Sequence, residues 1–349
     1  FSHIHRDIKK IDVRMAAVPC TVGGSNQKAR FVLRLLGLDV ALQDIDTLGF
    51  STHPDNDQIA QLRRIILQPN GLTLVTGKTG SGKTTTLLAL LGWKKKHDPE
   101  SAIYTLEDPV EKEVPHITHI GCNASTGGEM TFKRGLKQLL RLDPDVVMVG
   151  EIRDVEVANL SIEASMTGQL VFSTLHTNSA PETINRLIMM GVSETMLSDS
   201  LIGVIGQRVV SKVCPHCSYK AEFGKLMAGE HPLFKQGEYG MMLKELYSSA
   251  KERIKGISSA PHEHELVSVA NPSACSKCRG GTNGRHIVAE ILMANDEIRD
   301  LIVAGAHSRK ILQAAVATAN FRPMVHHGLS LVSDGTVAYE HVARMFSRN

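Results

Sequence analysis

A glycine-rich segment that begins at Gly77 has the residue types and the order needed to hold a phosphate group. The segment Gly77-Lys78-Thr79-Gly80-Ser81-Gly82-Lys83-Thr84 matches the pattern GxxxxGK[ST]. Its glycines let successive backbone N–H groups turn inward around a phosphate. In this pattern Lys83 reaches the β- and γ-phosphates of a nucleotide, and the hydroxyl of Thr84 ligates Mg²⁺. The predicted ligands are ATP and Mg²⁺, and the predicted binding residues are Gly77, Thr79, Gly80, Ser81, Gly82, Lys83, Thr84 and Thr85.

Two other predicted strands end in carboxylates. Residues 102–106 are followed by Glu107 and Asp108, and the apolar residues 146–149 are followed by Gly150 and Glu151. Active groups in parallel α/β sheets gather at the carboxyl ends of the strands. Glu107 and Glu151 are therefore predicted to act on the Mg²⁺ shell or on an attacking water. An acidic residue at a strand end can also cap a helix, but two beside a phosphate-binding segment favour phosphoryl chemistry.

A histidine follows the next predicted strand. His176 lies just past residues 170–174, where it is either an ordinary polar residue at a strand end or a contact to the γ-phosphate. Spacing alone leaves both interpretations open.

Four of the six cysteines form two CxxC pairs, Cys214 with Cys217 and Cys275 with Cys278. No export signal opens the chain, which favours thiolates on a metal over disulfides. Four thiolates make the tetrahedral set that Zn²⁺ accepts, and such a site is structural because it has no open position. A redox role for the pairs is the alternative. His262 and His264 lie between the pairs and are predicted to belong to a solvated loop rather than to a metal site.

The elements that must position these residues follow an alternating pattern. Strands are predicted at 72–76, 102–106, 146–149 and 170–173, and helices at 84–96, 131–142, 155–166 and 180–190. Continuous apolar strands separated by helices indicate an α/β fold with a parallel sheet covered on both faces. The strand before Gly77 and the helix after it are the context that the phosphate-binding pattern requires. A helix N-terminus at this point adds a positive dipole end.

The rest of the chain is less regular. Residues 3–36 alternate like two strands with a turn at 23–26, residues 55–67 are predicted to be a helix, and the chain is expected to be helical from about 286 to its end. The length of 349 residues predicts two to four structural units. Because the chain begins with Phe1 rather than Met, we expect that residues precede it in the full protein.

Composition argues against two classes of partner. The net charge is only +3 and aromatic residues make up 4% of the chain, which disfavours direct binding of nucleic acid. No apolar run approaches the ~20 residues needed to cross a bilayer.

Four motifs together resemble those of the type II secretion and type IV pilus assembly ATPases. Residues 77–84, 105–111, 143–154 and 173–178 are similar to that family's Walker A motif, Asp box, Walker B motif and His box. The resemblance covers essentially the whole chain. It implies four parts: the end of a PAS-like second N-terminal domain (1–45), a RecA-like ATPase core (46–210), a four-cysteine zinc-binding subdomain with a long insert (211–285) and a helical C-terminal subdomain (286–349).

The resemblance also implies roles for single residues. Glu107 is similar to the Asp-box carboxylate that positions or activates water, Glu151 to the Walker B glutamate and other candidate base, and His176 to the second His-box histidine. Gln169 stands where the family often has its first histidine. Arg14 and Arg34 fall in segments whose arginines approach the nucleotide phosphates, for which a guanidinium is well shaped. Outward-facing strand arginines are the alternative.

At the level of the whole protein, the resemblance implies a homo-hexameric ATP hydrolase in the cytoplasm, peripheral to the inner membrane. Its implied partners are the platform and docking proteins of a pilus or secretion machine. The hydrolysis would drive assembly of a type IV pilus or a secretion pseudopilus. A pilus retraction ATPase is an alternative that the four cysteines disfavour, and a nucleic-acid translocase is one that the composition disfavours.

Overall fold

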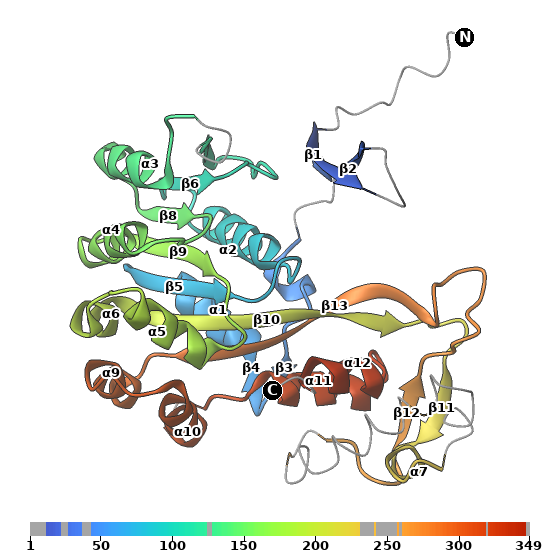
Figure 1. Cartoon of the computed structure of the whole chain (residues 1–349). Coiled ribbons are helices and arrows are strands. Elements are labelled where there is room, and N and C mark those ends of the chain that lie inside the picture. Colours follow the sequence, from blue (N-terminus) through green and yellow to red (C-terminus); the bar gives the residue numbers. More distant parts are fainter. Residues whose placement is uncertain are drawn as a thin grey trace.

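The computed structural model describes residues 12–21, 27–36, 43–123, 128–230, 241, 257, 260–318 and 320–346. Within these ranges, a seven-stranded sheet forms the centre of the molecule, in the order β13-β10-β5-β9-β8-β6-β7 (Figure 1). All neighbouring pairs are parallel except β10 with β13, which is antiparallel. The strands are β5 (Gly71–Thr76), β6 (Ile103–Glu107), β7 (Thr118–Gly121), β8 (Val146–Val149), β9 (Leu170–Leu175), β10 (Leu201–Val213) and β13 (Thr282–Met293).

Helices cover both faces of this sheet. Alternate residues of a strand point to opposite faces, so Leu74 and Val75 of β5 belong to different apolar clusters. The Leu74 face packs against α3 (Phe132–Leu139), α4 (Val155–Met166), α5 (Ala180–Met189), α6 (Glu194–Ser200), α9 (Asp296–Val303) and α10 (Ser308–Thr318). The Val75 face packs against α1 (Gln58–Ile66) and α2 (Lys83–His97). Because both faces are covered, every residue of β5, β8 and β9 is buried.

A third apolar cluster lies where β10 and β13 extend beyond the other strands (Figure 1). It joins the antiparallel pair β11 (Tyr219–Glu222) and β12 (Leu266–Val269) to α7 (Phe223–Met227), α11 (Met324–Ser333) and α12 (Tyr339–Phe346). Within the described ranges, the remaining strands form two antiparallel pairs, the ten-residue strands β1 (Asp12–Thr21) and β2 (Gln27–Leu36) and the two-residue strands β3 (Thr52–His53) and β4 (Asn56–Asp57). Described 3-10 turns span Ile45–Thr47 and Leu140–Leu142.

The alternating strands and helices predicted between residues 72 and 190 are confirmed, and so is the α/β fold class. The helix expected at 55–67 begins only at Gln58, after Asp57 caps it by accepting from the backbone N–H of Ala60. Within the described ranges, none of the helices combines the length and apolar character needed to span a bilayer.

The expectation of helix from residue 286 onward is wrong for the first part of that segment. Residues 282–293 form β13, and helices begin only at Asp296. Ile287 to Leu292 are all buried, and a short apolar run fits a buried helix or a buried strand equally well by its period. Pairing with β10 decides between them. The predicted turn at 23–26 lies outside the described residues, and so do residues 231–240, 242–256 and 258–259 between the cysteine pairs.

Candidate nucleotide site and candidate metal centre

The glycine-rich loop joins β5 to α2 and has a backbone that only glycine adopts easily. Gly77 and Gly82 have φ values of 150° and 85°. A Cβ atom on Gly77 would lie 2.3 Å from the carbonyl oxygen of Gln207, so β10 closes one side of the loop. Gly82 precedes α2 and offers no side-chain cap. The first N–H groups of α2 therefore have no capping side chain, which is the arrangement that receives an anion.

Lys83 lies inside this loop. Its Nζ donates to the carbonyl oxygen of Gly77 at 2.9 Å and lies 3.5 Å from Nδ1 of His176. Burial lowers the pKa of the Lys83 ammonium, while the negative charge of Glu151 opposes that shift. The ammonium is thus held where a phosphate in the loop would meet it.

Glu151 and His176 come from neighbouring strands and meet beside Lys83. Glu151 follows β8 and His176 follows β9, and these strands pair in parallel. One carboxylate oxygen of Glu151 lies 3.5 Å from Nε2 of His176. The other accepts a hydrogen bond from Nε of Arg153 at 2.6 Å. The structure thus brings three of the predicted residues together, and it adds Arg153, for which no role was predicted.

Glu107 ends β6, the strand on the other side of β8. The backbone N–H of Gly150 donates to the carbonyl oxygen of Leu106 at 2.7 Å, so the ends of β6 and β8 lie side by side. Glu107 is buried, and its Oε1 accepts from Thr105 Oγ1 at 2.7 Å and lies 2.9 Å from Nδ1 of His119. His119 was missed by the sequence reasoning because only the pairing of β7 with β6 brings it here.

The other predicted binding residues also lie in or next to the loop. Lys78, Thr79 and Gly80 are exposed, and Thr84 and Thr85 begin α2 with partial or full exposure. Ser81 is buried, and among the described residues its Oγ has no hydrogen-bond partner. Its carbonyl oxygen accepts from Nε2 of Gln207 at 2.7 Å. Gln207, which no sequence signal marked, thus supports the loop from β10.

Arg14 and Arg34 lie elsewhere. They occupy paired positions of β1 and β2, and Figure 1 shows this hairpin standing apart from the central sheet. Their side chains are outside what the structure describes, so an approach to the nucleotide stays a prediction.

The four predicted metal ligands form one cluster. Their sulfur atoms all lie within 4.8 Å of one another, with Sγ–Sγ distances of 3.8 Å (Cys214–Cys275), 3.6 Å (Cys217–Cys278) and 3.7 Å (Cys275–Cys278). Four sulfurs ~2.3 Å from a central zinc would be about 3.8 Å apart, whereas a disulfide needs ~2.05 Å. The cluster fits a tetrahedral ion and excludes disulfides in this arrangement.

Pairing of two strands assembles this cluster. The first CxxC pair follows the end of β10 and the second precedes β13, and these strands are antiparallel neighbours. Residues far apart in the sequence therefore meet at one end of the hairpin. His264 lies elsewhere, 3.0 Å from Glu222 on the surface, as expected of a solvated loop.

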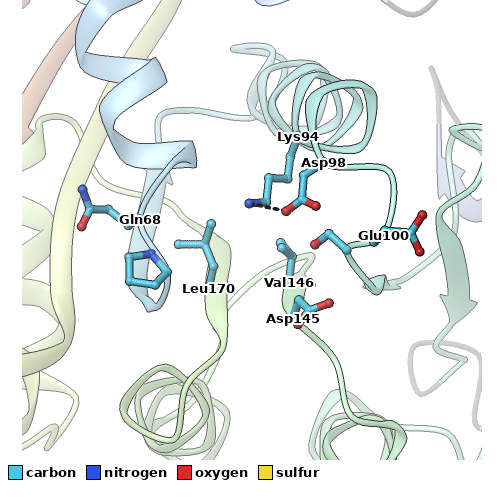
Figure 2. Close-up of a pocket in the computed structure, with 9 residues that line it drawn as sticks. Gln68, Lys94, Asp98, Glu100, Asp145, Val146 and Leu170 are labelled. Carbon is cyan, nitrogen blue, oxygen red and sulfur yellow. Dashed lines mark ion pairs between the residues drawn. The ribbon is translucent and has the colours of Figure 1, made fainter.

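A separate cavity of about 370 Å³ lies at the amino ends of the strands, opposite the ends that carry Glu107, Glu151 and His176 (Figure 2). Asp145, Val146 and Leu170 line it at the amino ends of β8 and β9, and Lys94 pairs there with Asp98 at 2.9 Å. Lys94 lies in the last turn of α2, whose first turn adjoins the glycine-rich loop. None of the predicted site residues lines this cavity.

Comparison with known proteins gives the family. Residues 2–344 match the family model described as type II/IV secretion system protein. The type II secretion system ATPase E of Vibrio cholerae is 36% identical over 339 residues, which are 97% of this chain and 59% of that protein. The type IV pilus assembly ATPase PilB of Thermus thermophilus is 34% identical over 333 residues, which are 95% of this chain and 33% of that protein.

Solved structures show the same fold. The pilus retraction motor PilT with bound ADP covers 95% of this chain and 77% of its own, with a TM-score of 0.58 at 24% identity. The ATPase DotB of Yersinia pseudotuberculosis covers 98% of this chain and 71% of its own, with a TM-score of 0.64 at 19% identity. The chain spans about 59% of the Vibrio relative's length. It belongs to the type II/IV secretion system protein family.

Proposed function

We propose that this chain is the ATP-hydrolysing part of a motor that drives assembly of a type IV pilus or a type II secretion pseudopilus. The observation that carries the proposal is the contiguity of Lys83, His176 and Glu151, each within 3.5 Å of the next at the mouth of the glycine-rich loop. A phosphate-binding ammonium, a histidine and a carboxylate at neighbouring strand ends make up a phosphoryl-transfer site. The family membership and the named relatives support the same assignment.

Each residue has a task in this proposal. The N–H groups of residues 77–84 hold the triphosphate, Lys83 neutralises its β- and γ-oxygens, and His176 contacts the γ-phosphate. Thr84 and Glu151 would hold Mg²⁺, which would supply positive charge against the transferred phosphoryl group. Glu107 or Glu151 accepts the proton of the attacking water. This arrangement accounts for two carboxylates at adjacent strand ends.

The four cysteines would hold Zn²⁺ in a closed structural site that fastens the end of the β10–β13 hairpin. The hexameric ring, the cytoplasmic location at the inner membrane, the platform and docking partners and the four-part division of the chain are further parts of the proposal. They rest on the resemblance of the four motifs to this family, and the chain spans 59% of the Vibrio relative and 33% of the Thermus relative.

Lys83→Ala tests the core of the proposal. Hydrolysis of ATP by the purified chain should fall to background, and binding of a fluorescent ATP analogue should weaken, because the buried ammonium that meets the phosphates is lost. Lys96→Ala is the matched control, since Lys96 lies in the same helix, outside the loop, with an exposed side chain. Release of phosphate by Lys83→Ala at the wild-type rate would overturn the proposal.

A further inference from the structure

His119 of the edge strand β7 and Glu107 of its neighbour β6 form a buried pair. Their side chains are exposed by only 6% and 4%, and Nδ1 of His119 lies 2.9 Å from Oε1 of Glu107. Thr105 and Glu107 are two residues apart on β6, so their side chains share one face. His119 stands opposite Thr105 on β7. From that position the imidazole reaches diagonally to the carboxylate that ends β6.

The hydrogen bonds fix which nitrogen of His119 carries the proton. Nε2 accepts from the backbone N–H of Val114 at 2.9 Å. A neutral imidazole that accepts at Nε2 has its proton on Nδ1. Nδ1–H therefore faces two acceptors, Oε1 of Glu107 at 2.9 Å and Oγ1 of Thr105 at 2.8 Å, and the hydroxyl of Thr105 donates to the same carboxylate oxygen at 2.7 Å.

Two donors on one oxygen leave the carboxylate asymmetric. Among the described residues, the hydrogen bonds of the Glu107 carboxylate all reach Oε1. These two hydrogen bonds fix the rotamer of the Glu107 side chain, and Oε2 takes no part in the network. A general base must lie within hydrogen-bond reach of the proton it takes, and Oε2 is the Glu107 oxygen that this network leaves for that task.

We propose that His119 is a positioning residue that holds Glu107 in the orientation required to act on the attacking water. The inference rests on the proposed function, because Glu107 acts on water only if the chain hydrolyses ATP. His119 acts through Oε1 of Glu107, so its effect belongs to turnover and not to ATP binding.

Two amide replacements separate positioning from simple support of the fold. The amide of His119→Asn occupies the place of Nδ1 and can donate to Glu107. The amide of His119→Gln occupies the place of Nε2 and can accept from Val114 but does not reach Glu107 as a donor. If His119 positions Glu107, Asn restores turnover and Gln does not. If His119 only anchors the segment at Val114, the order is reversed.

The measurement is steady-state ATP hydrolysis by the full chain, with kcat and KM resolved, beside His119→Ala. We expect His119→Gln and His119→Ala to lower kcat by roughly 10- to 100-fold, the size of effect that a misplaced catalytic group produces. KM for ATP should change less than about threefold, and His119→Asn should recover to within roughly fivefold of wild type. Circular dichroism and the thermal midpoint confirm that each variant is folded. A His119→Gln variant faster than His119→Asn would overturn the inference.

A double variant shows whether His119 acts through Glu107. Glu107→Gln combined with His119→Ala should be no slower than Glu107→Gln alone, because residues that act as a unit are not additive. If the two substitutions together lowered kcat by the product of their separate factors, the inference would be contradicted. Wild-type hydrolysis by Glu107→Gln would remove the role of Glu107 from the proposed function, whereas wild-type hydrolysis by Lys83→Ala would overturn the proposed function as a whole. The two failures are therefore distinguishable.

Discussion

Lys83, His176 and Glu151 form a continuous polar chain at the mouth of the glycine-rich loop. His176 is half exposed, while Glu151 retains about a quarter of its exposure and is held by Arg153. A carboxylate that is partly open to solvent and fixed on one side is available to a metal ion or a water on the other. At this scale the candidate chemistry depends on the charge of Glu151 and not on its shape.

Glu151→Gln tests this dependence. Glutamine keeps the size and one acceptor oxygen but removes the negative charge, so ATP binding should persist within about threefold while turnover falls by at least ~100-fold. Fluorescent-nucleotide titration and phosphate release measure the two effects. Glu156→Gln, which alters an exposed carboxylate paired with Lys133, is the control and should behave like wild type. Normal turnover of Glu151→Gln would contradict the role given to Glu151.

At the scale of elements, β10 links three parts of the molecule. Gln207 of β10 donates to the glycine-rich loop. The next residue, Arg208, donates to the carbonyl oxygens of Asn178, in the segment after His176, and of Met345 in α12. The strand then ends at the cysteine cluster. The register of β10 with β13 shifts between Ser211 and Val213, and the candidate nucleotide site and the candidate metal centre lie along this one strand.

Removal of one thiolate tests the metal centre at this scale. The purified protein should contain about one zinc per chain. Cys278→Ser should lose most of that zinc and lower the thermal midpoint, because metal binding contributes to folding. Ser276→Ala, an exposed position between the second pair of cysteines, should keep both. The assignment would be contradicted if the wild-type protein contained no zinc, or if Cys278→Ser kept about one zinc per chain.

At the scale of the whole molecule, buried polar groups tie the C-terminal helices to the sheet. Glu290 of β13 accepts from the backbone N–H groups of Ala180 at the start of α5 and of Met324 at the start of α11. Nδ1 of His327 in α11 accepts from the backbone N–H of Ala289 at 3.1 Å. Burial lowers the pKa of His327 to about 3, and the nearby His286 adds to the shift. The folded protein therefore keeps His327 neutral.

This predicts a specific acid sensitivity. The pKa of His327 is lower in the folded chain than the ~6.5 of an unfolded chain, so the unfolded state binds more protons between these values. Stability is complete above about pH 6.5 and is lost as the pH falls, by about 2 kcal/mol at pH 5. His327→Asn keeps an acceptor for Ala289 but does not titrate. Its free energy of unfolding should therefore fall by about 2 kcal/mol less between pH 7.5 and 5.

Denaturant unfolding at the two pH values measures this difference. Burial raises the pKa of Glu290 to about 6, which acts in the opposite direction on stability. Because Glu290 is present in both proteins, its contribution cancels in the comparison. The prediction would be contradicted if the free energy of unfolding fell by the same amount between the two pH values in wild type and in His327→Asn.

Sequence by itself determined the parts whose signals are local. Glycines at fixed spacing, apolar strands tipped with Glu107 and Glu151, and each CxxC pair are patterns of neighbouring residues, whereas the meeting of the two CxxC pairs depends on the pairing of β10 with β13. The tertiary structure alone decided the rest. The strand β13, the support from Gln207 and the pairing of His119 with Glu107 all arise from contacts between segments distant in the sequence. Such contacts are set by which strands become neighbours, and no local period or composition encodes that choice.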